Sequence, residues 1–162
     1  LAVLDRELAR LYKLAVNSPT LDAKEKKNLR AMQRGWIKGR DETWKVKDKK
    51  RYVADVYLLR IAEIRQQHPA SRAADSDGIS TGPVTYDCSG DRSKAYFIQI
   101  DPPRAVVYHN NTPFVVTLVR SGSGAKYVGE YADGRVEFWT KGKEALLTTL
   151  EGKELRCAEK TN

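Results

Sequence analysis

The sequence is poor in the residues on which catalysis and metal binding most often depend. It contains two histidines, two cysteines and one methionine among 162 residues. His68 and His109 belong to no cluster with metal-ligand spacing, and we expect them at surface or capping positions. The sequence also has no GxGxxG or phosphate-binding loop, no HExxH, no GxSxG and no CxxC. We therefore predict a protein that is not an enzyme and that binds neither metal nor cofactor.

Long apolar runs are also missing. No stretch approaches the roughly 20 residues that a membrane-spanning helix needs. The chain begins without methionine on "LAVLDRELARLYKL", which already has the pattern of an amphipathic helix, and we interpret this start as that of a processed or trimmed product. The composition, 41% hydrophobic and 31% charged, is typical of a folded globular protein.

Acidic residues are scarce in the first part of the chain only. Residues 1–68 hold 17 Lys or Arg and 9 Asp or Glu, whereas residues 84–162 hold 11 and 10. The excess of positive charge in residues 1–68 favours an anionic partner for this part of the chain. We single out Lys49, Lys50 and Arg51 as candidates to contact that partner. The alternative is an ordinary solvated helical face. Trp36 and Trp44 lie near these cations, but Trp36 fits an apolar stripe, so we expect no nucleic acid partner.

Hydrophobic spacing predicts three helices in residues 1–68. The second begins after Asp22, with Glu25 as its capping-box partner, and the third begins near Asp48. Their short connections predict a helical hairpin or small three-helix bundle. The three apolar stripes consist of Leu1, Leu4, Leu8, Leu11 and Ala15; of Leu29, Met32 and Trp36; and of Val53, Val56, Tyr57, Ile61 and Ile64.

The pattern changes after residue 68. Residues 69–83, "PASRAADSDGISTGP", have the composition of a linker. From residue 84 the hydrophobic period becomes two, and turn residues separate eight short candidate strands. We predict an α+β chain with a helical domain (1–68), a linker (69–83) and a domain (84–162) that forms an eight-stranded antiparallel β-barrel, or else a sandwich. The strands are "VTYDC", "KAYFIQI", "AVVYH", "PFVVTLV", "KYVGEYA", "RVEFWT", "ALLTTL" and "KELRC".

The two cysteines, Cys88 and Cys157, lie near opposite ends of the second domain. A bond between them would close a loop of about 70 residues and stabilise the domain by roughly 4 kcal/mol. It would also indicate an oxidising compartment, such as the periplasm or the exterior. Two buried free thiols in a cytosolic protein are the alternative.

Several motifs of the second domain occur together in one known family. They are "YDC" (86–88), "SGSGAKY" (121–127), "FWTKGKEALL" (138–147) and the late "RC" (156–157). With them, residues 86–157 resemble the MliC/PliC family of bacterial inhibitors of c-type lysozyme. This resemblance implies a secreted or periplasmic inhibitor, free or anchored to a membrane through a segment outside this chain, and a disulfide between Cys88 and Cys157. It implies c-type lysozyme as the protein partner.

The resemblance also implies which residues enter the lysozyme cleft. The serine of the family's SGxxY segment corresponds to Ser123, and the lysine of its KG turn corresponds to Lys141. Both belong to narrow, glycine-flanked segments that could plug a cleft. A catalytic Ser–Lys couple is the other interpretation of this pair, but no feature predicts the desolvated lysine it needs. The implied binding residues also include Gly122, Gly124, Tyr127 and Gly142, with Trp139 and Glu144 as supports.

Residues 1–67 look like the helical domain of LprI-type proteins, which is also associated with lysozyme inhibition. "LAVLDRELARLYK", "QRGWIKGRD" and "VADVYLLRIAEI" carry the likeness. The sequence departs from that pattern at Thr43 and Tyr52, where we would expect cysteines. A second hypothesis is therefore a non-inhibitory module of the cell envelope, whose basic helices contact anionic lipid or polysaccharide.

Overall fold

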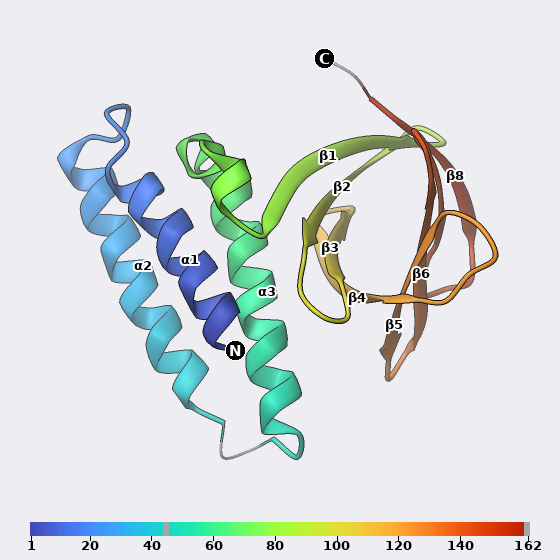
Figure 1. Ribbon diagram of the computed structural model, residues 1–162, viewed down its shortest axis with the longest axis horizontal. Helices are drawn as coiled ribbons and strands as arrows, with labels where there is room; N and C mark the ends of the chain where they lie inside the picture. Colours follow the sequence, from blue (N-terminus) through green and yellow to red (C-terminus); the bar gives the residue numbers. More distant parts are fainter. Residues whose placement is uncertain (44–45, 161–162) are drawn as a thin grey trace. The chain divides into compact units, whose positions relative to one another are not determined.

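The computed structural model describes residues 1–43 and 46–160 of the chain (Figure 1). Trp44, one of the two tryptophans near Lys49, Lys50 and Arg51 in the sequence, lies outside the described residues. The chain divides into two compact units, Leu1–Gly78 and the remainder from Ile79 onward. The first unit is helical and the second is a closed antiparallel barrel, so the predicted fold class is confirmed.

The helical unit contains α1 (Ala2–Val16), α2 (Ala23–Asp41) and α3 (Lys49–Gln67). The predicted capping box is present, because the Asp22 carboxylate accepts from the Glu25 N–H at 2.8 Å and the Asp22 N–H donates to the Glu25 carboxylate at 2.9 Å. The Asp48 carboxylate accepts from the Arg51 N–H at 3.1 Å. Short polar side chains at these two positions satisfy N–H groups that a helix start leaves without partners.

The helices pack through most of the predicted stripes. In α1 the buried apolar residues are Leu4, Leu8, Leu11 and Ala15, whereas Leu1 is 51% exposed. The stripe of α2 differs more from the prediction, since Leu29 is its one buried residue and Met32 is 51% exposed. The α2 side chains that pack against other helices are Leu29, Gln33 and Trp36. The ring centroids of Trp36 and of Tyr57 in α3 are 5.0 Å apart, in an edge-on arrangement. Met32 lies to the side of the row formed by Leu29, Gln33 and Trp36.

Residues 69–78 are held by one buried arginine, Arg65, and one half-buried arginine, Arg10. They form two short 3₁₀ helices, η1 (Pro69–Arg72) and η2 (Asp75–Asp77). Arg65 of α3 is fully buried and donates to both carboxylate oxygens of Asp75, at 2.9 and 2.7 Å. Arg10 of α1 donates to the Glu7 carboxylate and to the Ala74 carbonyl. The segment that we predicted as a linker thus provides acceptors for both arginines, the Asp75 carboxylate and the Ala74 carbonyl. The last residues of the predicted linker, from Ser80 onward, belong to the first strand.

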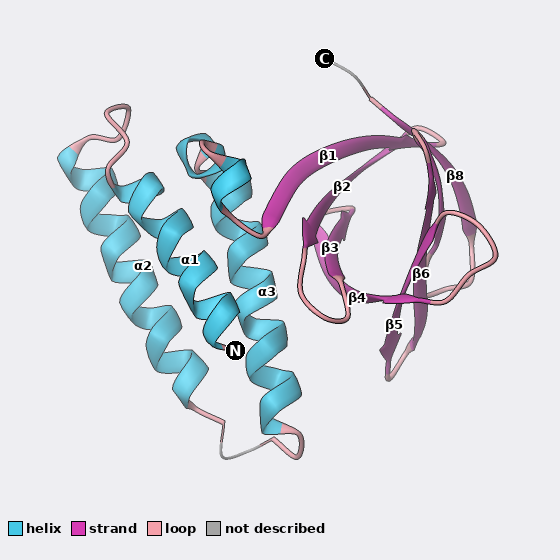
Figure 2. Ribbon diagram, viewed as in Figure 1, coloured by secondary structure: helices cyan, strands magenta, loops and turns pink. Residues whose placement is uncertain are grey.

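The second unit is an eight-stranded antiparallel barrel in which each strand pairs with its neighbours in the chain (Figure 2). Pairing of the first strand with the last closes it. A two-residue turn at Asn110-Asn111 has positive φ angles of 50° and 64°, as hairpin turns of this length require. The strands are β1 (Ser80–Cys88), β2 (Asp91–Ile98), β3 (Arg104–His109), β4 (Thr112–Val119), β5 (Ala125–Tyr131), β6 (Gly134–Lys141), β7 (Glu144–Thr148) and β8 (Glu154–Glu159).

The barrel core is apolar and includes the disulfide. In β6, for example, inward residues alternate with outward ones, and Val136 and Phe138 are buried. Cys88 and Cys157 face each other across the β1–β8 pair and are bonded. The disulfide therefore joins the two strands that close the barrel, and the predicted pairing is confirmed.

Breaking the Arg65–Asp75 ion pair should destabilise the helical unit. In Asp75→Asn the buried guanidinium loses a charged partner, and we expect the free energy of unfolding of this unit to fall by about 2–3 kcal/mol. Urea unfolding followed by circular dichroism at 222 nm measures this, because helices dominate that signal. Asp77→Asn, which removes the exposed carboxylate two residues away, is the matched control. Equal midpoints for the two variants would contradict the assigned role.

Opening the disulfide should destabilise the barrel. It closes a loop over a sequence separation of 69 residues, so the Cys88→Ala/Cys157→Ala variant should lose about 4 kcal/mol of stability on the chain-entropy model. Tyrosine and tryptophan fluorescence during denaturant unfolding measures the loss. Wild type unfolded with and without reductant provides the comparison. Coincident unfolding curves would show that the strand pairing alone keeps the barrel closed.

Candidate functional site

The loop between β4 and β5 and the turn between β6 and β7 lie at the same end of the barrel, because consecutive hairpins alternate between its two ends. Pairing of β5 with β6 brings them together, since Ala125 lies opposite Thr140 at the point where both segments leave the sheet. Ser123 is two residues before Ala125, and Lys141 is one residue after Thr140. The two segments singled out from the sequence are therefore neighbours in space.

Hydrogen bonds give the β4–β5 loop a defined shape. The indole N–H of Trp139 donates to the Ser123 carbonyl at 2.8 Å. The Ser121 hydroxyl donates to the carbonyls of Ser123 and Gly124, at 3.1 and 3.3 Å. Ser121 thus folds the loop back on itself. The Ser123 side chain is exposed, and no described residue forms a hydrogen bond with its hydroxyl.

Gly124 allows the loop to approach the neighbouring turn closely. Its φ angle is +63°, and a Cβ atom placed on it would lie 2.2 Å from the Thr140 carbonyl oxygen and 2.8 Å from Cγ of Lys141. Only glycine fits such a contact between two backbones. Gly142 also has a left-handed φ, +61°, which shapes the turn after Lys141, but a Cβ there would meet no atom within 4 Å.

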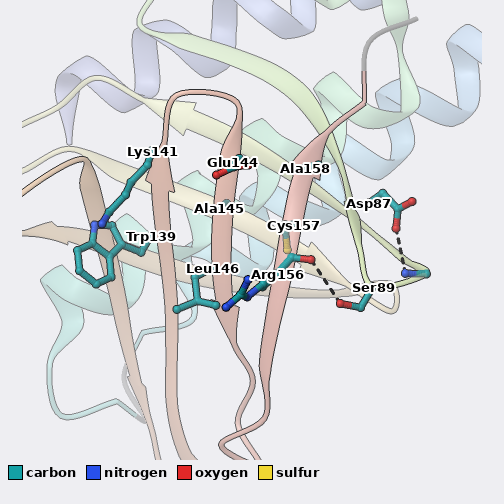
Figure 3. Close-up of a pocket in the computed structure, with 11 residues that line it drawn as sticks. Asp87, Ser89, Trp139, Lys141, Glu144, Ala145, Leu146, Arg156, Cys157 and Ala158 are labelled. Atoms are coloured by element: carbon teal, nitrogen blue, oxygen red, sulfur yellow. Dashed lines mark hydrogen bonds between the residues drawn. The ribbon is translucent and has the colours of Figure 1, made fainter.

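Trp139 also supports the lysine. The Lys141 ammonium nitrogen lies 4.3 Å from the centroid of the Trp139 ring, and that of Lys126 lies 5.1 Å from it. Both distances suit a cation–π contact. Figure 3 shows the Lys141 side chain extended along the indole, while the residue as a whole is exposed. One half-buried tryptophan therefore contacts both segments, through its N–H and through its ring.

Two other predicted site residues take different positions. Tyr127 is 6% exposed and lies inside the barrel, where the centroid of its ring is 5.8 Å from that of the Phe97 ring. Burial raises the pKa of its hydroxyl. Tyr127 therefore packs in the core of the barrel, and its side chain is not exposed beside Ser123 and Lys141. Glu144 is exposed at the start of β7, directly opposite Lys141 in the hairpin register.

A surface groove that the sequence reasoning missed adjoins the lysine. It has a volume of about 610 Å³ on the outer wall of the barrel. Figure 3 shows Lys141 and Trp139 on one side of it and the β1–β2 turn with Ser89 on the other. One signal was present in the sequence, the adjacent Leu146 and Leu147, of which only one can face inward. The residues that line the groove are Asp87, Ser89, Gly90, Trp139, Lys141, Glu144, Ala145, Leu146, Arg156, Cys157 and Ala158.

The other candidates from the sequence lie outside this end of the barrel. Lys49, Lys50 and Arg51 form the exposed first turn of α3 in the helical unit. His68 ends that helix, and burial, reinforced by the nearby Arg60 charge, lowers its pKa. His109 is the last residue of β3, and its Nδ1 atom lies 3.0 Å from the Ser93 hydroxyl oxygen.

Within the described part of the chain, no three His, Cys, Asp or Glu side chains are placed to hold a metal ion. No helix of that part combines the length and the hydrophobicity needed to cross a bilayer.

Fold and site together define a small, disulfide-closed β-barrel that presents two mutually braced loops at one end, as a module for binding a partner would. Residues 86–156 match the family described as "Membrane-bound lysozyme-inhibitor of c-type lysozyme" (MliC). The resemblance of the barrel to this family, predicted from its motifs, is confirmed.

Curated relatives extend the comparison. A membrane-bound lysozyme inhibitor of C-type lysozyme from Cupriavidus necator is 37% identical over 86 residues, which cover 50% of this chain and 66% of the relative. Lipoprotein LprI from Mycobacterium tuberculosis is 29% identical over 153 residues, covering 91% of this chain and 68% of the relative. The chain thus spans about two thirds of the length of each of these relatives. No solved structure matches the chain significantly.

Replacing Gly124 should separate the loop from the turn. In Gly124→Ala the new methyl group collides with the Thr140 carbonyl, so we expect a loss of more than about 1 kcal/mol in stability and loss of the hydrogen bond from Trp139. The indole N–H resonance of Trp139, assigned with Trp139→Phe, reports this bond. Gly122→Ala is the matched control, because a Cβ there meets no atom within 4 Å. An unmoved resonance in Gly124→Ala would contradict the packing described above.

Proposed function

We propose that this protein inhibits c-type lysozyme by inserting the Ser123 loop and Lys141 into the active-site cleft of the enzyme. The observation that carries the proposal is the contact of both segments with one tryptophan, Trp139. The family match and the name of the Cupriavidus relative support lysozyme as the partner. LprI covers nearly the whole chain, so a relative with both units exists.

The chemistry of the exposed groups suits that cleft. A lysozyme cleaves its polysaccharide with two carboxyl groups that flank the scissile bond, one protonated and one ionised. The Ser123 hydroxyl can donate a hydrogen bond to a carboxylate, and the Lys141 ammonium can form a charge-assisted one. A carboxylate that accepts such bonds is unavailable to the substrate. No covalent step is required.

Preorganisation of the loops favours tight binding. Because Ser121, Gly124 and Trp139 fix the loop backbone before the partner arrives, association does not have to order it. Loops ordered in advance lose less conformational entropy on binding than flexible ones. The narrow glycine-flanked tip can then enter a cleft that larger side chains would block.

We also propose that the protein works outside the cytoplasm, where a lysozyme would meet it. The disulfide supports an oxidising compartment. The names of the relatives, a membrane-bound inhibitor and a lipoprotein, point to the cell envelope. Evasion of host defence would follow from such a location and activity.

Replacing Ser123 or Lys141 should weaken inhibition. Each replacement with alanine removes one hydrogen bond to a charged group, about 1.5–3 kcal/mol, so the inhibition constant should rise roughly 10- to 100-fold for each. A lysozyme turbidity assay on bacterial cell walls measures it. Ser76→Ala and Lys153→Ala provide a serine and a lysine control away from both loops.

The outcomes separate the function from the site. Wild type that fails to inhibit c-type lysozyme at micromolar concentration would reject the proposed function. Inhibition by the wild type that persists unchanged in Ser123→Ala/Lys141→Ala would keep the function and reject these residues. Equal losses in the control variants would point to a general effect of surface changes.

A further inference from the structure

Helix α2 carries a row of basic side chains that we call the cationic ridge. The helix contains seven basic residues and two acidic ones. Five of the basic residues are exposed and recur at three- and four-residue steps, which places them on one side of the helix. From the first to the last they extend roughly 20 Å along its axis. The members of the ridge are Lys24, Lys27, Arg30, Arg34 and Lys38.

The ridge faces away from the rest of the helical unit. The opposite side of α2 makes the contacts with its neighbours, through buried Leu29, through Gln33, which accepts a hydrogen bond from Arg60, and through Trp36. On the open side, a Cβ placed on Gly35 or Gly39 would meet no atom within 4 Å. The ridge therefore lies on the convex side of α2 that its neighbours in the helical unit leave open.

The charges of the ridge are not neutralised by the described residues. The two acidic residues of α2 have other roles, since Glu25 belongs to the capping box and Asp41 pairs with Arg40 at 2.9 Å. No member of the ridge forms an ion pair with a described residue. Arg30, Arg34 and Lys38 follow each other at four-residue spacing, where like charges destabilise a helix. The ridge thus weakens the helix that bears it.

Two basic residues on the outside of the barrel have acidic partners. Arg135 pairs with Glu130 at 3.2 Å and with Glu137 at 3.0 Å, and Lys126 lies 3.5 Å from Glu137. The residues from 79 onward include 11 basic and 10 acidic side chains. What distinguishes α2 is that five cations without a described ion-pair partner lie on one side of one helix.

We propose that the cationic ridge docks the protein on the surface of an anionic lipid bilayer. A long, convex row fits a plane of negative headgroups, because each Lys or Arg can reach a separate headgroup and add to the attraction. Met32 and Ile37, 51% and 39% exposed, flank the ridge and offer apolar contacts at the interface. A linear acidic polymer would be held better between two elements than on the convex side of one helix, where the ridge lies.

This surface differs from the one proposed for lysozyme, and the inference does not depend on that function. The exposed Lys49, Lys50 and Arg51 occupy the first turn of α3, where the helix dipole disfavours cations. They can add to the attraction of the helical unit for negative headgroups. They do not form part of the ridge.

Vesicle binding by the full chain tests the proposal. We expect the protein to co-sediment with vesicles of about 30% phosphatidylglycerol in phosphatidylcholine and not with phosphatidylcholine alone. Binding should weaken as the salt concentration rises from roughly 50 to roughly 300 mM. In Lys27→Gln/Arg30→Gln/Arg34→Gln/Lys38→Gln the partition coefficient should fall at least about tenfold. Helix content should persist, because the change removes like-charge repulsion.

A barrel variant with the same loss of charge is the matched control. Arg92→Gln/Arg120→Gln/Lys153→Gln/Lys160→Gln changes four exposed barrel cations that belong to neither proposed surface and should bind vesicles like the wild type. Equal losses in both variants would overturn the assignment to α2, as would unchanged binding by the ridge variant. Binding to soluble polygalacturonate with none to anionic vesicles would reject the bilayer as the partner. Lysozyme inhibition by the ridge variant should stay at the wild-type level, which separates the two proposals.

Discussion

The antiparallel pairing of β5 with β6 is the constraint on which the candidate site depends. It fixes Ala125 opposite Thr140, and so joins a loop and a turn that are separated by a whole hairpin in sequence. Trp139 then contacts both, since its outward ring supports Lys141 and its N–H holds the Ser123 carbonyl. A shift of one residue in this register would turn Trp139 into the core and move Phe138 out of it. The burial of Phe138 therefore also keeps the site assembled.

Much of this arrangement could be predicted because it follows local rules. The starts of two helices were evident from Asp22 and Asp48, since short acidic side chains satisfy free N–H groups at a helix start. The alternation of apolar residues predicted eight strands, and the barrel confirms them. The proximity of Ser123 and Lys141 was implied by a family resemblance, whereas its physical cause, the contact of Gly124 with Thr140, is visible only in three dimensions.

The differences from prediction arise where distant groups decide the structure. Residues 69–78 have the composition of a linker, yet buried Arg65 uses Asp75 as its partner, and no local pattern indicates a pairing of that kind. Met32 has helical spacing from Leu29 and Trp36 and was therefore expected to pack with them. In the structure Met32 is exposed, and Gln33 faces the neighbouring helix in its place. The groove beside Lys141 likewise depends on four strands and a turn that only barrel closure brings together.

Charge is segregated between the two units, and this segregation makes the two proposed contacts compatible. Residues 1–78 contain 18 basic and 11 acidic side chains, whereas the barrel is nearly neutral. C-type lysozymes are usually basic, so a strongly cationic barrel would repel such an enzyme during the approach. A nearly neutral barrel reduces that repulsion, while the exposed Lys141 still offers a cation to the cleft carboxylates. Cations that would hinder the barrel are instead concentrated on α2, where a negative lipid surface would attract them and bring the protein to the membrane.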